Sequence, residues 1–153
     1  MLKYVNYSVV FQEIPGETTL AINISNCPVK CPGCHSKYLW ENIGLRLDEE
    51  FIDSMMRLYG HEITCMAFMG GDADPDRILE IVGYIKKKYP AIKTAWYSGM
   101  TKIRIKNLDY IKVGPYIKEK GGLRNPNTNQ RLYKITNGII SDITKMFWVK
   151  KRK

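Results

Sequence analysis

Three cysteines, Cys27, Cys31 and Cys34, stand within eight residues of this chain, and their type and spacing point to metal chemistry. Thiolates at this spacing can all reach one metal centre from a single loop. A structural zinc site or an electron-transfer cluster generally needs four protein ligands. A set of three thiolates therefore predicts a metal centre with one position left open for another molecule.

Two other residues offer a fourth ligand and therefore a closed site. His35 could complete a Cys3His zinc site, although its place directly after Cys34 is awkward for closing a tetrahedron around the same metal. Cys65 could close a four-cysteine cluster, but it lies inside an apolar run, which favours a buried and inert core thiol. A closed, non-catalytic iron-sulfur or zinc module is the competing interpretation.

The strands that would position the cysteine loop can be read from composition and alternation. Residues 4–24 are rich in β-branched and aromatic residues and are broken at Pro15-Gly16, so they predict a hairpin whose second strand runs into the loop. The other predicted strands share an apolar run that ends at a glycine-containing turn: residues 63–69, 92–97 and 110–113.

Two helices are predicted between these strands. The first begins after Asp48 as N-cap, ends at Gly60, and has an apolar face that includes Phe51 and Leu58. The second begins after Asp74 and ends before Pro90. Alternating strands and helices with glycine turns after the strands predict an α/β fold of mainly parallel strands, arranged as a shortened, open partial (β/α) barrel.

The length of 153 residues fits one domain over residues 1–153. Within it we expect N-terminal strands, a cluster loop, βα units and a C-terminal segment, which span residues 4–24, 25–40, 48–118 and 119–153. Ligands of open α/β sheets bind beyond the carboxyl ends of the strands. The cysteine loop and the turns after the later strands should therefore converge on one edge of the sheet.

The chain is basic, with 24 Lys and Arg against 15 Asp and Glu and a net charge of +9, which favours acidic partners. Nucleic acid is disfavoured as the partner because the basic residues are spread along the chain rather than gathered in a stripe with aromatic residues. The sequence shows neither a signal-peptide pattern nor a membrane span, so we expect a cytoplasmic protein with reduced cysteines.

The pattern Cys-x3-Cys-x2-Cys after one strand, followed by Gly70-Gly71-Asp72 after the next, resembles the cluster motif and the Gly-Gly-Glu-type motif of radical S-adenosylmethionine (SAM) enzymes. Within that superfamily the chain is similar to the activating proteins of anaerobic ribonucleoside-triphosphate reductases. The segments that carry this similarity are Cys31-Pro32-Gly33-Cys34-His35, Trp40, Gly70-Gly71-Asp72-x-x-Pro75, Trp96-Tyr97-Ser98-Gly99, Val113-Gly114-Pro115-Tyr116-Ile117 and Asn129-Gln130-Arg131.

The resemblance implies two cofactors, a 4Fe-4S cluster and SAM. Cys27, Cys31 and Cys34 would hold the cluster, whose fourth iron would bind the amino and carboxylate groups of SAM. The residues that would contact SAM lie in the cysteine loop and in two strand-end turns: Gly33, Cys34, His35, Gly70, Gly71, Asp72 and Ser98. For Asp72 a loop-capping role is an equal alternative, and Ser98 could instead bond only its own backbone.

The resemblance also implies a reaction. One electron, from a donor such as flavodoxin, would cleave SAM to methionine and a 5′-deoxyadenosyl radical. That radical would take hydrogen from a glycine of the large glycyl-radical subunit of the reductase. Two related functions stay open at this point: a radical SAM enzyme that acts on a small molecule, and the activase of another glycyl-radical enzyme.

Overall fold

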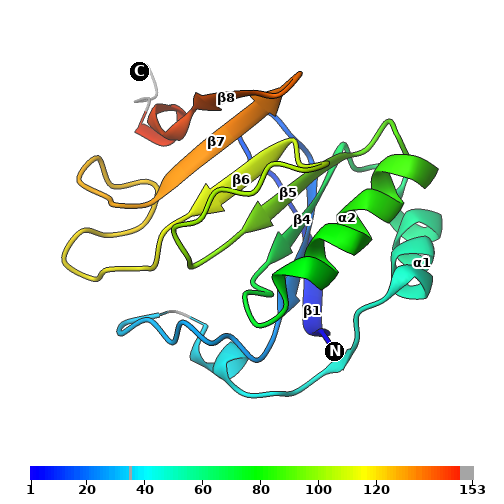
Figure 1. Ribbon diagram of the computed structural model, residues 1–153, viewed down its shortest axis with the longest axis horizontal. Coiled ribbons are helices and arrows are strands. Elements are labelled where there is room, and N and C mark those ends of the chain that lie inside the picture. The colour runs from blue at the N-terminus through cyan, green and yellow to red at the C-terminus, as the bar shows by residue number, and fades with distance from the viewer. Residues whose placement is uncertain (35, 149–153) are drawn as a thin grey trace.

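The computed structural model describes residues 1–34 and 36–148, and this part of the chain forms one mixed sheet flanked by helices (Figure 1). The strands are β1 (Lys3–Val10), β2 (Thr19–Ile24), β3 (Leu45–Arg46), β4 (Cys65–Met69), β5 (Lys93–Tyr97), β6 (Tyr110–Val113), β7 (Arg131–Thr136) and β8 (Ile139–Asp142). The helices are α1 (Glu49–Tyr59), α2 (Pro75–Lys88) and the 3-10 turns η1 (Lys37–Trp40) and η2 (Thr144–Trp148). The strand order is β3-β1-β2-β4-β5-β6-β7-β8.

The middle of the sheet is parallel and its flanks are antiparallel. β2, β4, β5 and β6 pair in parallel, with α1 before β4 and α2 before β5. β1 pairs antiparallel with β2 and β3, and β7 does so with β6 and β8. The α/β class is confirmed. The expectation of mainly parallel strands holds for the middle four, and the sheet is open, with β3 and β8 at its edges.

Helix α1 begins and ends where the sequence predicts. The Asp48 side chain accepts a hydrogen bond from the Phe51 backbone N–H at 2.9 Å, and the helix ends at Gly60. Phe51 and Ile52 are buried against the sheet, but Leu58 is 66% exposed, so its predicted place on the buried face is wrong. At about 100° per residue, Leu58 lies only about 20° around the helix from the buried Phe51, so its exposure follows from its place in the last turn of α1 and not from the side of the helix on which it lies.

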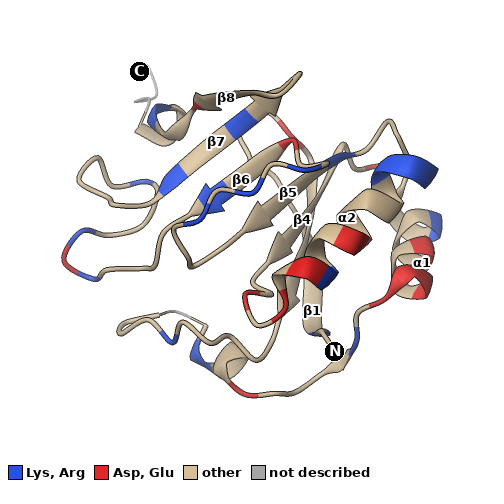
Figure 2. Cartoon of the chain, in the orientation of Figure 1, with Lys and Arg blue, Asp and Glu red and all other residues tan. Residues whose placement is uncertain are grey.

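Helix α2 has local signals at both ends. Asp74 accepts from the Arg77 backbone N–H at 3.3 Å, Pro75 is the first helical residue, and the last turn is basic. Both arrangements favour the helix dipole, and Figure 2 shows the acidic residues at the start of each helix. The Arg77 guanidinium binds both carboxylate oxygens of Glu49, at 3.1 and 2.6 Å, and so joins α2 to α1.

The two faces of the sheet are packed differently. Both α-helices lie on one side, which we call the helix face (Figure 1). There, bulky side chains of the strands, such as Met66, Phe68 and Trp96, join the apolar sides of the helices in the main core. The alternate strand residues point to the opposite side, the open face, where the buried cluster is smaller and consists of Ile14, Cys65, Ala67, Ala95, Tyr110 and Leu132.

The C-terminal segment contains structure that its sequence pattern did not reveal. The sequence predicts only a C-terminal segment over residues 119–153, and within it the chain forms the hairpin β7-β8 followed by η2. The turn is Asn137-Gly138, with positive φ at both residues (51° and 78°), as a tight hairpin turn requires. Among the described residues, no helix has the length and apolar character needed to span a membrane.

Candidate iron-sulfur site

The loops that follow β2, β4, β5 and β6 meet at one edge of the sheet, as predicted (Figure 1). Gly70 donates its backbone N–H to the carbonyl of Tyr97 at 3.0 Å, and Ser98 donates to that of Lys112 at 2.8 Å. These bonds continue the parallel ladder past the strand ends. They bring the loops into register with one another, and we call the result the carboxyl edge.

The cysteine loop packs against two of its neighbours at the carboxyl edge. The Tyr116 backbone N–H donates to the Sγ of Cys31 at 3.3 Å. A Cβ added at Gly99 would lie 2.9 Å from Cγ2 of Val29, so the loop after β5 also touches the cysteine loop. The loop is thus seated on the turns after β5 and β6.

All three cysteines of this loop are free and half-buried. The Ser36 backbone N–H donates to the Sγ of Cys34 at 3.4 Å, in addition to the bond that Cys31 accepts from Tyr116. Backbone N–H groups directed at ligand sulfurs tune iron-sulfur clusters. In residues 1–34 and 36–148, no three His, Cys, Asp or Glu side chains are gathered as a preformed metal site. Three free thiols on one loop nevertheless provide the donor set of an iron-sulfur cluster.

Cys65 is separated from this loop. It is the first residue of β4, four residues before the carboxyl end of the strand, which is about 13 Å along the chain at the usual rise. It is fully buried on the open face, and burial raises the pKa of its thiol to about 12. The structure therefore places Cys65 in the core, as its apolar surroundings predicted. His35, the other possible fourth ligand and a predicted SAM contact, lies outside the described residues.

Gly70 and Gly71 allow the main chain to pass closely over its neighbours. Both have positive φ, 111° and 98°. A Cβ on Gly71 would lie 2.6 Å from Cδ1 of Ile78, and one on Gly70 would lie 3.1 Å from the carbonyl oxygen of Ile24. The Gly70 carbonyl accepts from Nε1 of Trp96 at 2.7 Å. The close packing of the main chain against Ile24 and Ile78 thus requires both glycines, and the approach of SAM to this turn stays a prediction.

Asp72 and Ser98 form one buried unit. The Ser98 hydroxyl donates to Oδ1 of Asp72 at 2.5 Å, and the Gly99 N–H donates to Oδ2 at 2.8 Å. Ser98 Oγ also accepts from the Met100 N–H at 3.0 Å. Both residues thus cap the turn after β5, and the contacts with SAM that the resemblance assigns to them stay predictions. A cavity of about 350 Å³ lies beside them.

Lys112 is a residue of this edge that the sequence analysis missed. It is only 8% exposed, and its ammonium donates to the carbonyls of Ser98 at 3.1 Å and Gly114 at 2.9 Å. Burial lowers the pKa of Lys112 to about 8, against the opposing influence of Asp72 and the three loop cysteines. The available signal was a lysine inside the otherwise apolar strand of residues 110–113.

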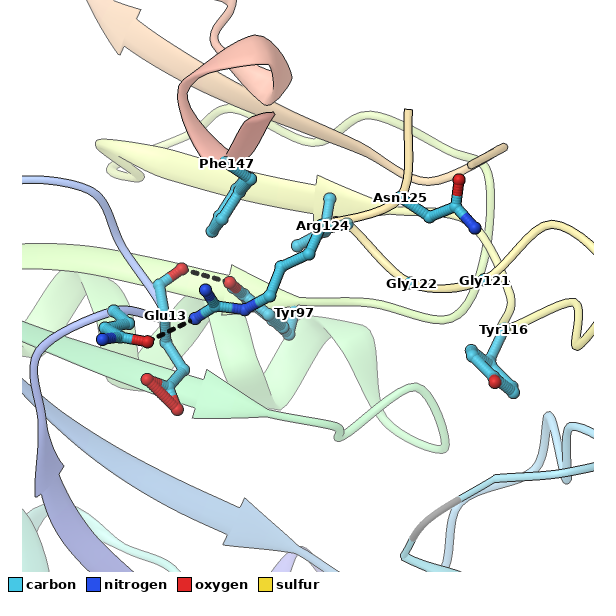
Figure 3. Close-up of a pocket in the computed structure, with 10 residues that line it drawn as sticks. Glu13, Tyr97, Tyr116, Gly121, Gly122, Arg124, Asn125 and Phe147 are labelled. Atoms are coloured by element: carbon cyan, nitrogen blue, oxygen red, sulfur yellow. Dashed lines mark hydrogen bonds between the residues drawn. The ribbon is translucent and has the colours of Figure 1, made fainter. Parts of the chain in front are cut away.

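A larger cavity of about 670 Å³ opens on the open face (Figure 3). Its walls come from the loop before β2, the end of β5 and the loop after β6. Tyr97 donates its hydroxyl to the Glu13 carbonyl, and Arg124 donates to the Gln12 side chain at 2.8 Å. Tyr116 also lines this cavity, and its backbone N–H binds Cys31. The cavity therefore adjoins the cysteine loop.

The segment Asn129-Gln130-Arg131 holds the turn after β6 through side-chain hydrogen bonds. Asn129 donates to the Pro115 carbonyl at 3.1 Å, and Gln130 donates to that of Gly114 at 3.4 Å. The Gln130 side chain is buried, so this residue braces the turn after β6.

The fold is of the α/β class, and the loop of three free thiols offers ligands for an iron-sulfur cluster. The family model described as "4Fe-4S single cluster domain" matches residues 15–119, and the chain belongs to that family. The match extends from the turn before β2 past β6 and so includes the cysteine loop and all the parallel strands. No curated protein and no solved structure matches the chain.

Proposed function

We propose that this protein is a radical SAM activating enzyme that generates the glycyl radical of an anaerobic (class III) ribonucleoside-triphosphate reductase. One observation carries the proposal: a free three-cysteine loop of a 4Fe-4S family chain is seated on the turns after β5 and β6 at the carboxyl edge. Three ligands leave one iron open for a second molecule.

In this proposal Cys27, Cys31 and Cys34 hold the cluster. The residues that would hold SAM at the carboxyl edge are Gly33, Cys34, Gly70, Gly71, Asp72 and Ser98. His35, the remaining predicted contact, lies outside the described residues. When bound, the cluster and SAM supply a one-electron cleavage that yields methionine and a 5′-deoxyadenosyl radical.

The protein's own residues fix the turns on which these groups would rest. Asp72 and Ser98 hold the turn after β5 through their mutual hydrogen bond and their bonds to Gly99 and Met100. Asn129 and Gln130 hold the turn after β6. Fixed dipoles and closely packed turns limit competing reactions of a radical.

The open face provides a route for a macromolecular substrate. The 670 Å³ cavity has no α-helix over it among the described residues, and it adjoins the cysteine loop through Tyr116. A glycine-bearing loop of the large reductase subunit could enter there without displacing the core.

The surface around the cysteine loop suits an acidic electron donor such as flavodoxin. Exposed basic residues stand on the cysteine loop, on η1 and on the loop after β6 (Figure 2): Lys30, Lys37, Lys118 and Lys120. Positive charge near a redox centre speeds the encounter with an acidic partner and is screened by salt.

The test begins with anaerobic reconstitution with iron and sulfide. The reduced protein should convert SAM to 5′-deoxyadenosine, and Cys31→Ala should form none. With the large reductase subunit present, electron paramagnetic resonance should detect a glycyl radical with the wild-type protein only. Tetrahedral zinc without iron-sulfur absorption, or a 4Fe-4S cluster that cleaves no SAM, would contradict the proposal.

The cavity volume favours one second candidate, a radical SAM enzyme with a small-molecule substrate. Small-molecule pockets span about 300–1,000 Å³, and the open-face cavity, at about 670 Å³, lies within that range. The same experiment separates the two functions. Formation of 5′-deoxyadenosine without a glycyl radical on the reductase subunit would favour the small-molecule enzyme.

A further inference from the structure

Lys112 stands in a row of side chains that crosses the carboxyl edge on the open face. The strand register pairs Asn23 of β2 with Met69 of β4, Met69 with Tyr97 of β5, and Tyr97 with Lys112 of β6. The Lys112 ammonium lies 5.9 Å from the centroid of the Tyr97 ring. This row is the part of the sheet nearest the cysteine loop and the open-face cavity.

The hydrogen bonds of Lys112 join the two turns on which the cysteine loop rests. Its ammonium binds the Ser98 carbonyl in the turn after β5 and the Gly114 carbonyl in the turn after β6. The first turn contacts the cysteine loop at Val29 and the second binds Cys31 through Tyr116. The position of the ammonium is therefore coupled to the position of the cysteine loop.

Lys112 has no direct counter-charge. Among the described residues no carboxylate lies within ion-pair distance of it, and both oxygens of nearby Asp72 accept from Ser98 and Gly99. A buried charge is expensive unless it is paired and hydrogen-bonded. The negative groups that favour the charged form of Lys112 are Asp72 and the three loop cysteines. A thiolate-bound cluster on that loop would supply the missing negative charge.

We propose that Lys112 is the counter-charge of the iron-sulfur cluster and raises its reduction potential. This inference rests on the cluster site proposed above. Reduction adds one negative charge to the cluster, and a positive charge held nearby in a poorly solvated region stabilises the reduced form. Because Lys112 is buried, salt screens this interaction less than it screens the exposed lysines around the loop.

The test compares the midpoint potential of the reconstituted cluster in three variants, without SAM and without the reductase. Lys112→Gln removes the charge and keeps a hydrogen-bond donor, and Lys112→Arg keeps the charge. Lys134→Gln is the matched control, because it removes one exposed charge from β7, where Lys134 pairs with Tyr110 at the far end of β6.

We expect Lys134→Gln and Lys112→Arg to keep the wild-type iron content and a potential near that of the wild type. Lys112→Gln should have a lower potential, by an amount equal to at least a tenfold change in the reduced-to-oxidised ratio, or about 59 mV for one electron. If its cluster is too labile to titrate, its iron content should fall several-fold below that of Lys112→Arg.

Two results would overturn the inference. The first is a fully loaded Lys112→Gln protein with an unchanged potential. The second is equal loss of the cluster from Lys112→Gln and Lys112→Arg, which would assign Lys112 a steric role. Failure of the proposed function looks different: the wild-type chain itself would bind no cluster, or its cluster would not cleave SAM while the potential of Lys112→Gln still shifted.

Discussion

The helix face and the open face of the sheet are built from the same strands but from different kinds of side chain. On β4 the helix face carries Met66 and Phe68, whereas the open face carries Cys65 and Ala67. The large residues are sealed beneath α1 and α2. The open face also bears a cavity of about 670 Å³ that reaches the cysteine loop.

This difference separates stability from chemistry within one sheet. Burial of large apolar side chains supplies most of the free energy of folding, and here those side chains are concentrated on the helix face. The open face has fewer buried apolar groups and instead carries Lys112 and Tyr97 near the cysteines. A site on that face can stay accessible because the helix face maintains the fold.

The largest expected effect comes from replacing one apolar residue on each face, a fully buried one on the helix face and a half-buried one on the open face. Ile81→Ala, on the buried side of α2, should lower the free energy of unfolding by about 2–5 kcal/mol through lost burial and a cavity. Leu123→Ala, at the half-buried wall of the open-face cavity, should lower it by less than about 1 kcal/mol. Urea unfolding measures both, and equal losses would end the distinction between the faces.

A somewhat smaller effect is expected at the Gly70-Gly71 turn, which packs against the core of the helix face. Gly71→Ala places a Cβ against Ile78 at positive φ and should cost about 2–4 kcal/mol, because backbone strain and overpacking add. Gly138→Ala, also at positive φ but with nothing within 4 Å of the new Cβ, isolates the backbone strain at about 1–2 kcal/mol. If thermal unfolding showed equal losses for both variants, the close approach at Gly71 would be refuted.

The smallest effect concerns a carboxylate between the helices. Asp53 accepts from the hydroxyls of Tyr89 at 2.6 Å and Tyr84 at 2.8 Å, and its pKa is lowered chiefly by the Tyr89 hydrogen bond. Because folding lowers the pKa of Asp53, its ionised carboxylate stabilises the folded protein. This stabilisation is complete above pH 3.8, the ordinary pKa of an aspartate, and is lost as the pH falls through the lower pKa of the folded protein.

Asp53→Asn should therefore lower the free energy of unfolding by about 1–2 kcal/mol at pH 7. The difference from the wild type should shrink as the pH is lowered below 4. Unfolding curves at pH 7, 5 and 3 measure it. A difference that is constant across this range would show that the charge of Asp53 contributes nothing.

Features fixed by neighbours in the chain could be predicted from the sequence. Asp48 and Asp74 cap the two helices as predicted. Such caps can be predicted because the side chain bonds a backbone N–H only three residues further along the chain. The convergence of the strand-end loops also followed from the sequence, because parallel strands place their carboxyl ends together. Leu58 was misplaced because its burial depends on how far α1 overlaps the sheet.

Features that depend on distant partners could not be predicted. A lysine is ordinarily expected at the surface. The ammonium of Lys112 is buried because the register of β5 and β6 places it between the Ser98 and Gly114 carbonyls. The open-face cavity joins residues 12 and 124, whose hydrogen bond spans most of the chain. No local pattern encodes such pairings.

The central claim is that three cysteines, without Cys65, hold a 4Fe-4S cluster with one open iron. The most direct test measures iron content and the electron paramagnetic resonance spectrum of reduced Cys65→Ala, with and without SAM, beside Cys31→Ala. The account predicts full iron content and a spectrum changed by SAM for Cys65→Ala, and loss of the cluster for Cys31→Ala. Loss of the cluster from Cys65→Ala, or a spectrum that SAM does not change, would contradict it.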